Sequence, residues 1–115
     1  MPEHKYLFEN DATVIKRDKL RIEPYDQGKI ENTLRSLFKT SKDIPEPDVN
    51  KTIISIANTV TFKIMNKYTE YSFEHIPTWE IQEVLEKELM DFKLYKTLKL
   101  CILLGHTKDM FNALK

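Results

Sequence analysis

The chain has 115 residues, of which 41% are hydrophobic and 31% charged, a length and balance typical of one globular domain with a modest core. Lysine plus arginine equals aspartate plus glutamate at 18 each, and this zero net charge argues against a generic nucleic-acid-binding protein, which needs a basic face. The single cysteine, Cys101, excludes an internal disulfide, and the lack of a long apolar run or of a secretory signal in residues 1–5 predicts a cytoplasmic protein without membrane association.

The first predicted element is a small β-hairpin. We expect residues 1–12 to form a polar leader, after which two short apolar segments, 13–16 and 20–23, flank a charged turn. Pro24 ends the second strand because it has no N–H to donate. Asp26 is a good helix N-cap, so the hairpin leads directly into the start of a helix.

Helical spacing of apolar residues predicts the rest of the chain. A first helix runs to about residue 39 and a second from about 48 to 68, separated by a connection rich in helix breakers. Residues 71–76 alternate briefly and are either a third short strand or an extended linker. Thr78 is expected to cap a third helix, and a last helix spans 92–104, with Gly105 closing it. Residues 106–115 are assigned to a separate C-terminal segment.

The stretch from Val14 to Ile30 reads VIKRDKLRIEPYDQGKI. It resembles the signature of the ATP-cone family, in which Lys-Arg-Asp, Glu-Pro-aromatic-Asp and Lys-Ile follow in that order. One departure is the hairpin turn, where Lys19-Leu20 replaces the family's glycine and makes the turn one residue longer. The order of predicted elements is similar to the cone arrangement, an α+β, mostly α fold in which a four-helix bundle is capped by a hairpin or three-stranded sheet over residues 13–105.

The resemblance implies a regulatory domain without its own active site that binds ATP or dATP, with Mg²⁺, as an allosteric ligand. Such domains resemble the activity-control domain of ribonucleotide reductases, where the two nucleotide states usually differ in oligomeric assembly. The implied partners are therefore an adenine nucleotide and either another protein or further copies of the chain.

The resemblance also implies which residues contact the nucleotide. Lys16, Arg17 and Lys29 are expected at the phosphates, although a charge run in a hairpin is also compatible with plain solvation. Glu23 lies near the nucleotide, and Asp26 either reads the sugar or base or serves only as the helix cap. A carboxylate beside a triphosphate is repulsive unless it binds ribose hydroxyls or Mg²⁺.

The third helix and the C-terminal part contribute the rest of the expected site. Thr78 and Gln82 lie four residues apart on one helical face, and the resemblance places them by the adenine base. Leu103 stands where the family commonly has an aromatic residue, and the arginine expected nearby is missing. The ends of the signature, Val14 and Ile30, complete the expected nucleotide-binding set.

Two other functions remain open from the sequence. One is a helical protein-interaction module that has lost nucleotide binding, which the altered turn and the missing arginine favour. The other is a nucleotide-responsive transcriptional regulator, since one repressor family joins this cone to a zinc ribbon. The absence of paired cysteines argues against that second alternative.

Overall fold

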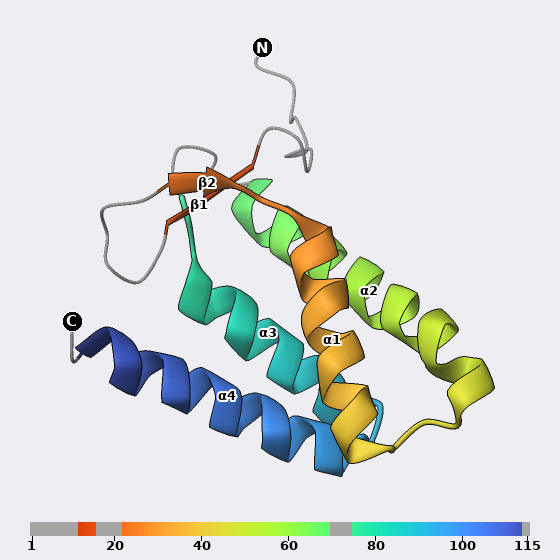
Figure 1. Cartoon of the computed structure of the whole chain (residues 1–115). Coiled ribbons are helices and arrows are strands. Elements are labelled where there is room, and N and C mark those ends of the chain that lie inside the picture. The colour runs from red at the N-terminus through yellow and green to blue at the C-terminus, as the bar shows by residue number, and fades with distance from the viewer. Residues whose placement is uncertain (1–11, 16–21, 70–74, 114–115) are drawn as a thin grey trace.

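The computed structural model describes residues 12–15, 22–69 and 75–113, without the side chains of 68–69 and 106–113. It is a bundle of four main helices with a small three-stranded sheet at one end (Figure 1). The predicted α+β, mostly α fold is confirmed. In chain order the elements are β1 (Thr13–Ile15), β2 (Ile22–Pro24), α1 (Gln27–Ser41), the 3₁₀ turn η2 (Glu46–Asp48), α2 (Val49–Thr69), β3 (Ile76–Pro77), α3 (Thr78–Asp91) and α4 (Tyr95–Ala113).

The sheet holds the starts of two helices together. β1 is its central strand, antiparallel to β2 with Val14 opposite Glu23, and parallel to β3 with Val14 opposite Ile76. The hairpin is thus confirmed, and the segment left open as strand or linker ends in a short strand. Pro24 is the last residue of β2, where its missing N–H is tolerated. Because β2 leads into α1 and β3 into α3, pairing with β1 places the starts of α1 and α3 side by side.

The four helices close into a ring around the core. α2 packs against α1 and α3, and α4 packs against α3 and α1. An apolar stripe on α2 is fully buried from Ile53 to Ile64, so the free energy of burial outweighs the low helix propensity of its β-branched residues. Its 0% exposed side chains are those of Ile53, Ile56, Ala57, Val60 and Ile64.

Two ion pairs with buried carboxylates join α3 to α2. Glu88 and Glu80 on α3 bind the ammonium groups of Lys63 and Lys67 on α2, and the glutamate side chains are only 4% and 6% exposed. The hydrogen bond from Lys63 to Glu88 raises the pKa of the lysine. Because a buried carboxylate is costly without a partner, these pairs fix how α2 lies against α3.

A connecting-loop residue caps α4 from a distance. One carboxylate oxygen of Asp43, between α1 and α2, accepts hydrogen bonds from the backbone N–H of Thr97 at 2.8 Å and from its hydroxyl at 2.9 Å. The Thr97 hydroxyl also lies 2.7 Å from that of Ser41, the last residue of α1. The end of α1 and the start of α4 are therefore held together by one buried polar cluster.

Three predicted helix boundaries were wrong. The last helix begins at Tyr95, later than Phe92, because the chain reverses through Lys93, whose φ of 60° is left-handed. It then continues through Gly105 to Ala113, so 106–113 is not a separate helix. The N-cap of α3 is Pro77 and not Thr78, whose hydroxyl instead donates to the carbonyl oxygen of Ile15 at 2.9 Å. None of the described helices has the length and apolar character needed to cross a membrane.

Candidate functional site

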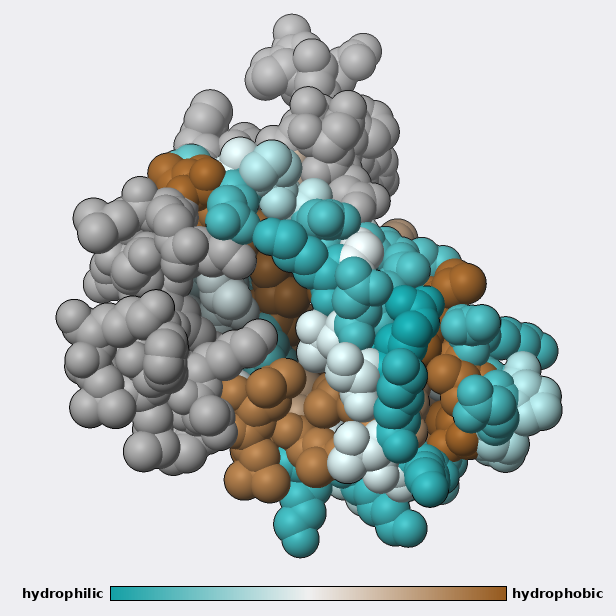
Figure 2. Space-filling model, viewed as in Figure 1, coloured by the Kyte–Doolittle hydropathy of each residue, from teal (hydrophilic) through white to brown (hydrophobic). Residues whose placement is uncertain are grey.

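A cavity of about 180 Å³ lies beneath the sheet, where α1 and α3 begin. Figure 2 shows apolar side chains inside the hollow between these two helices. Its wall combines an apolar part with several polar groups, as ligand sites do. The lining residues are Val14, Glu23, Pro24, Tyr25, Asp26, Lys29, Ile30, Thr33, Thr78, Ile81, Gln82, Leu85 and Leu104.

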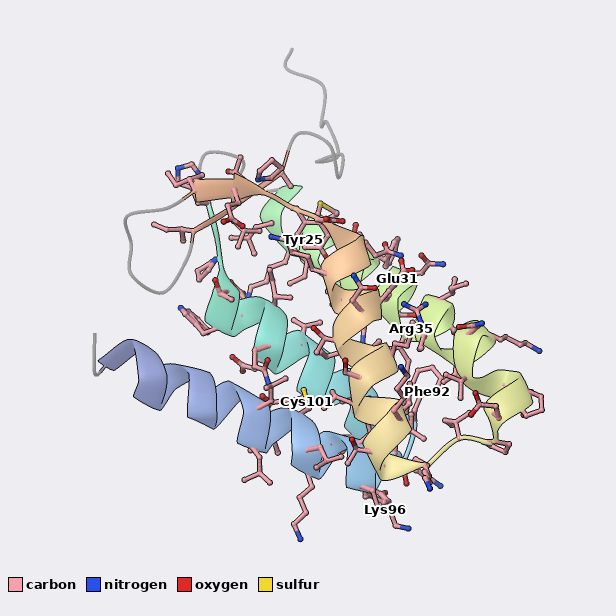
Figure 3. The ribbon with its side chains drawn as sticks, viewed as in Figure 1. Tyr25, Glu31, Arg35, Phe92, Lys96 and Cys101 are labelled. Carbon is pink, nitrogen blue, oxygen red and sulfur yellow. The ribbon has the colours of Figure 1, made fainter. Side chains whose placement is uncertain are left out.

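The hairpin end of the wall is fixed by a buried tyrosine. Tyr25, only 5% exposed, donates its backbone N–H to Ala12 at 3.0 Å, and its hydroxyl lies 2.9 Å from that of Thr61 on α2. Figure 3 shows Tyr25 at the junction of β2 and α1. Anchored in this way, it sets Glu23 at one edge of the cavity and Asp26 at the first residue before α1.

The start of α1 carries a negative charge of its own. The Asp26 carboxylate accepts the N–H of Gly28 at 2.9 Å, which confirms the predicted N-cap. Lys29 then reaches back to Glu23, with 2.9 Å between the ammonium nitrogen and the carboxylate oxygen. Among the described lining residues, two carboxylates thus face a single ammonium group.

α3 supplies the opposite wall through its first two turns. Its N-cap residue, Pro77, makes no side-chain hydrogen bond to the first N–H groups of the helix. One turn later, the amide nitrogen of Gln82 donates to the backbone carbonyl of Cys101 on α4 at 3.0 Å and to the carboxylate of Glu86 at 2.8 Å. Figure 3 shows Cys101 pointing from α4 toward α3.

Gly105 makes room for this amide. A β-carbon at Gly105 would lie 2.9 Å from the amide nitrogen of Gln82, closer than real contacts allow. Gly105, which was predicted to end the helix, is buried in the middle of α4, next to the Gln82 side chain. The lack of a side chain at Gly105 allows this close packing, and it does not mark the end of the helix.

Comparison with known proteins decides the family. A model of the ATP cone domain matches residues 12–110. The chain belongs to the ATP cone family. No match was found among curated proteins. ATP cones are regulatory domains that bind ATP or dATP as allosteric effectors and are not catalytic.

The cone's cavity collects most of the residues nominated from the sequence. Seven of these residues line it, although they come from three separate parts of the chain. They are Val14, Glu23, Asp26, Lys29, Ile30, Thr78 and Gln82. Lys16 and Arg17 lie outside the described residues, so their place at the phosphates stays a prediction. Leu103 is 55% exposed and its neighbour Leu104 lines the cavity instead, so a nucleotide contact by Leu103 also stays a prediction.

Sequence reasoning did not nominate several lining residues of the cone. Tyr25 stands in the signature, but its aromatic ring is a buried anchor and the signature alone gave it no role. Ile81 and Leu85 lie about one turn apart on α3, before and after Gln82, and neither was nominated for the site. Thr33 follows Lys29 by one helical turn, a spacing that places both on the same face. Helical periodicity applied to the nominated residues would have found these three.

No group of three or more His, Cys, Asp or Glu side chains is arranged to hold a metal ion in the part of the cone that the structure describes. The residues that fit Mg²⁺ best are Glu23 and Asp26, because carboxylate oxygens suit this hard cation. Together with substrate-like phosphates, one or two carboxylates are the usual protein contribution to a magnesium site.

Proposed function

We propose that this cone binds ATP or dATP in the cavity between α1 and α3, and that the bound nucleotide controls the oligomeric assembly of a ribonucleotide reductase or a similar partner. The observation that carries the proposal is the convergence of five nominated signature residues with Thr78 and Gln82 on one cavity: Val14, Glu23, Asp26, Lys29 and Ile30. Its volume of about 180 Å³ is below the roughly 300–1,000 Å³ of a typical ligand site, so only part of a nucleotide would be enclosed.

The adenine base would lie against α3. Both amide hydrogens of Gln82 are directed at Cys101 and Glu86, which leaves its carbonyl oxygen as the group that can accept a hydrogen bond from a ligand. Adenine carries an amino group at position 6, whereas guanine carries an oxygen there. The arrangement therefore favours adenine, while Ile81 and Leu85 supply apolar contact to the ring.

The ribose would lie against the carboxylates of Glu23 and Asp26, which can accept hydrogen bonds from hydroxyl groups. ATP and dATP differ by one such hydroxyl. A nucleotide shifts an equilibrium only through different affinities for its two states, so this edge of the cavity is where we place the discrimination. The contacts around this one hydroxyl would then give ATP and dATP different affinities for two states of the protein that differ in assembly.

The triphosphate would lie toward the hairpin, bound by Lys16, Arg17 and Lys29. Lys29 is ion-paired with Glu23 at 2.9 Å, so binding requires the ammonium group to turn from the carboxylate to a phosphate, or Mg²⁺ to neutralise that carboxylate. The start of α1 is already occupied by Asp26, whereas the start of α3 has no side-chain cap among the described residues. The backbone N–H groups at the start of α3 are thus better placed than those of α1 to bind an anion.

Because ATP and dATP pools are intracellular, we place the protein in the cytoplasm.

Calorimetric titration of the chain with ATP, dATP and GTP, followed by mass measurement of the assemblies, tests the proposal. We expect both adenine nucleotides to bind more tightly than GTP, and ATP and dATP to give different distributions of assembly size. If neither adenine nucleotide releases or absorbs heat on mixing and no assembly changes, the chain is better described as a helical protein-interaction module. A mass change without nucleotide selectivity would also contradict the proposal.

A further inference from the structure

A second and larger cavity lies at the other end of α1. Its volume is about 460 Å³, and it is formed by the last two turns of α1, the connection that follows, and the start of α2. The nucleotide cavity contacts the first half of α1 through Lys29, Ile30 and Thr33, so the two cavities occupy opposite halves of the same helix. Both can therefore be filled at the same time.

Three cations stand in a row beside this second cavity. Arg35, Lys39 and Lys42 follow one another along α1 at spacings of four and three residues, a rise of about 10 Å at 1.5 Å per residue. Figure 3 shows Arg35 on the side of α1 that faces α2. Glu46 is the one acidic residue in the described lining.

The three cations differ from the lysines at the described helix contacts. Lys63 and Lys67 are ion-paired with buried glutamates of α3, and Lys29 is paired with Glu23. Within the described residues, by contrast, no ion pair is formed by the three cations of the second cavity, and Arg35 donates only to the amide oxygen of Asn32 at 3.1 Å. In a chain of zero net charge, this is a local excess of positive charge.

Helix electrostatics explain part of this row but not all of it. A cation in the last turn is stabilised by the helix dipole, which accounts for Lys39 and for Lys42 just beyond the helix end. Arg35 lies more than one turn before that end, beyond the reach of the effect. The dipole also gives no reason for the hollow itself, whose floor includes the buried ring of Phe38 and the half-buried side chain of Ile44.

We propose that this cavity receives an acidic segment of a partner protein that carries an apolar side chain between its carboxylates. A single phosphate would meet the three charges but would leave the apolar floor of Phe38 and Ile44 uncovered. On one side of an extended segment alternate residues lie 6–7 Å or so apart, so two carboxylates flanking an apolar side chain span about 13 Å. The long side chains at the two ends of the row can reach these carboxylates, while the apolar side chain between them would lie on Phe38 and Ile44. The inference rests on the proposed function in one respect, because a regulatory domain needs a surface through which it acts.

The test is an NMR titration of the whole chain with the peptide Ac-Glu-Asp-Phe-Asp-Glu-NH₂. We expect shifts of the backbone amides of 35–50 that saturate in the range of about 0.1–1 mM and weaken as salt rises. Two further probes separate the alternatives. Ac-Gln-Asn-Phe-Asn-Gln-NH₂ keeps the ring but has no charge, and tripolyphosphate keeps the charge but has no ring. Both should bind at least about fivefold more weakly.

The double variant Lys39→Gln/Lys42→Gly removes two of the three charges, and glycine suits the left-handed φ of 55° at position 42. It should weaken the acidic peptide about fivefold or more, while the control Lys87→Gln/Lys99→Gln, with the same change in charge at exposed positions outside both cavities, should not. The ATP-induced rise in melting temperature should be equal in both, so loss of one site is distinguishable from loss of the other. Tripolyphosphate binding as tightly as the peptide, or no shifts in 35–50 at about 5 mM peptide, would overturn the inference.

Discussion

The side-chain amide of Gln82 lies 3.0 Å from the backbone carbonyl oxygen of Cys101, so the residue that we place at the adenine base also joins α3 to α4. This contact fixes the amide with its nitrogen toward α4. The carbonyl oxygen of the same side chain is left as the group that we expect to face the ligand. The contact between two helices therefore orients the group that we propose to distinguish the bases.

Replacing Gln82 by Ala removes the acceptor for the adenine amino group, and we expect the affinity for ATP to fall more than that for GTP. A hydrogen bond of this kind contributes roughly 0.5–1.5 kcal/mol, so the loss for ATP should be about threefold to tenfold. Calorimetric titrations of both nucleotides measure it. Glu83→Ala, at an exposed position next to Gln82, is the control and should change neither affinity. An equal loss for ATP and GTP would show that Gln82 does not read the base.

Replacing Gly105 by Ala tests whether this glycine makes room for the amide. Alanine is favoured over glycine in a helix by about 1 kcal/mol, but its β-carbon would come within 2.9 Å of the Gln82 nitrogen. We expect the amide to be displaced, so ATP affinity falls although the melting temperature changes little. In the background Gln82→Ala, the same substitution should stabilise the fold and leave ATP affinity unaltered. A rise in melting temperature with unchanged ATP affinity in the wild-type background would count against the account.

Asp43 should contribute to stability through α4, although it lies in the loop before α2. Its carboxylate accepts two hydrogen bonds from Thr97 in the first turn of that helix. Asp43→Ala should lower the free energy of unfolding by about 1–2 kcal/mol, as loss of a helix cap does. Urea denaturation measures this, with the exposed Asp48→Ala as the matched control. Equal stability of the two variants would show that the distant cap is unimportant.

The pair of Lys63 and Glu88 predicts a loss of stability at alkaline pH. The hydrogen bond to Glu88 raises the pKa of Lys63 in the folded state above its usual value of 10.5. The resulting stabilisation is fully present below that value and is lost as pH rises through the higher folded pKa. Denaturant unfolding at a series of pH values should therefore show a steeper alkaline decline for the wild type than for Lys63→Met. Lys51→Met, without a glutamate partner in the described residues, should keep the wild-type slope.

The fold could be predicted from the sequence because the helical spacing and the capping residues agreed with the burial that the structure shows. The spacing of Ile30, Leu34 and Phe38 predicted α1, and Asp26 predicted its start. The signals failed where a distant contact decided the outcome. Gly105 looked like a helix end, since nothing in the neighbouring residues shows that Gln82, far away in the chain, needs its space.

The residues of the candidate site were likewise predictable where they belong to a local sequence pattern, and not where helix packing decides their position. Residues of the signature were predictable as a group because their order is itself specific, and those nominated from it that the structure describes line one cavity: Val14, Glu23, Asp26, Lys29 and Ile30. The presence of Leu104 in the lining was not predictable, because one residue along a helix is a rotation of about 100°. That rotation is set by how α4 packs on α3, which depends on many weak contacts. Lys16 and Arg17 remain predictions for experiment to test.

The phosphate contacts can be tested by substitution. Charge-assisted hydrogen bonds to phosphate contribute roughly 1.5–3 kcal/mol each, so Lys16→Ala or Arg17→Ala should cut ATP affinity about tenfold or more. The melting temperature without nucleotide should barely change, because neither side chain is expected in the core. Lys19→Ala, in the same predicted turn, is the control and should have little effect.

The most direct measurement of the central claim is the melting curve of the unmodified chain with and without millimolar ATP or dATP. A ligand that binds only the folded state at a hundredfold excess over its Kd stabilises that state by about 2.7 kcal/mol. In a domain of this size, such a gain raises the melting temperature by on the order of 10 °C, which is the result we predict for at least one of the two nucleotides. Melting curves that neither nucleotide moves would contradict nucleotide sensing by this cone, even with its fold intact.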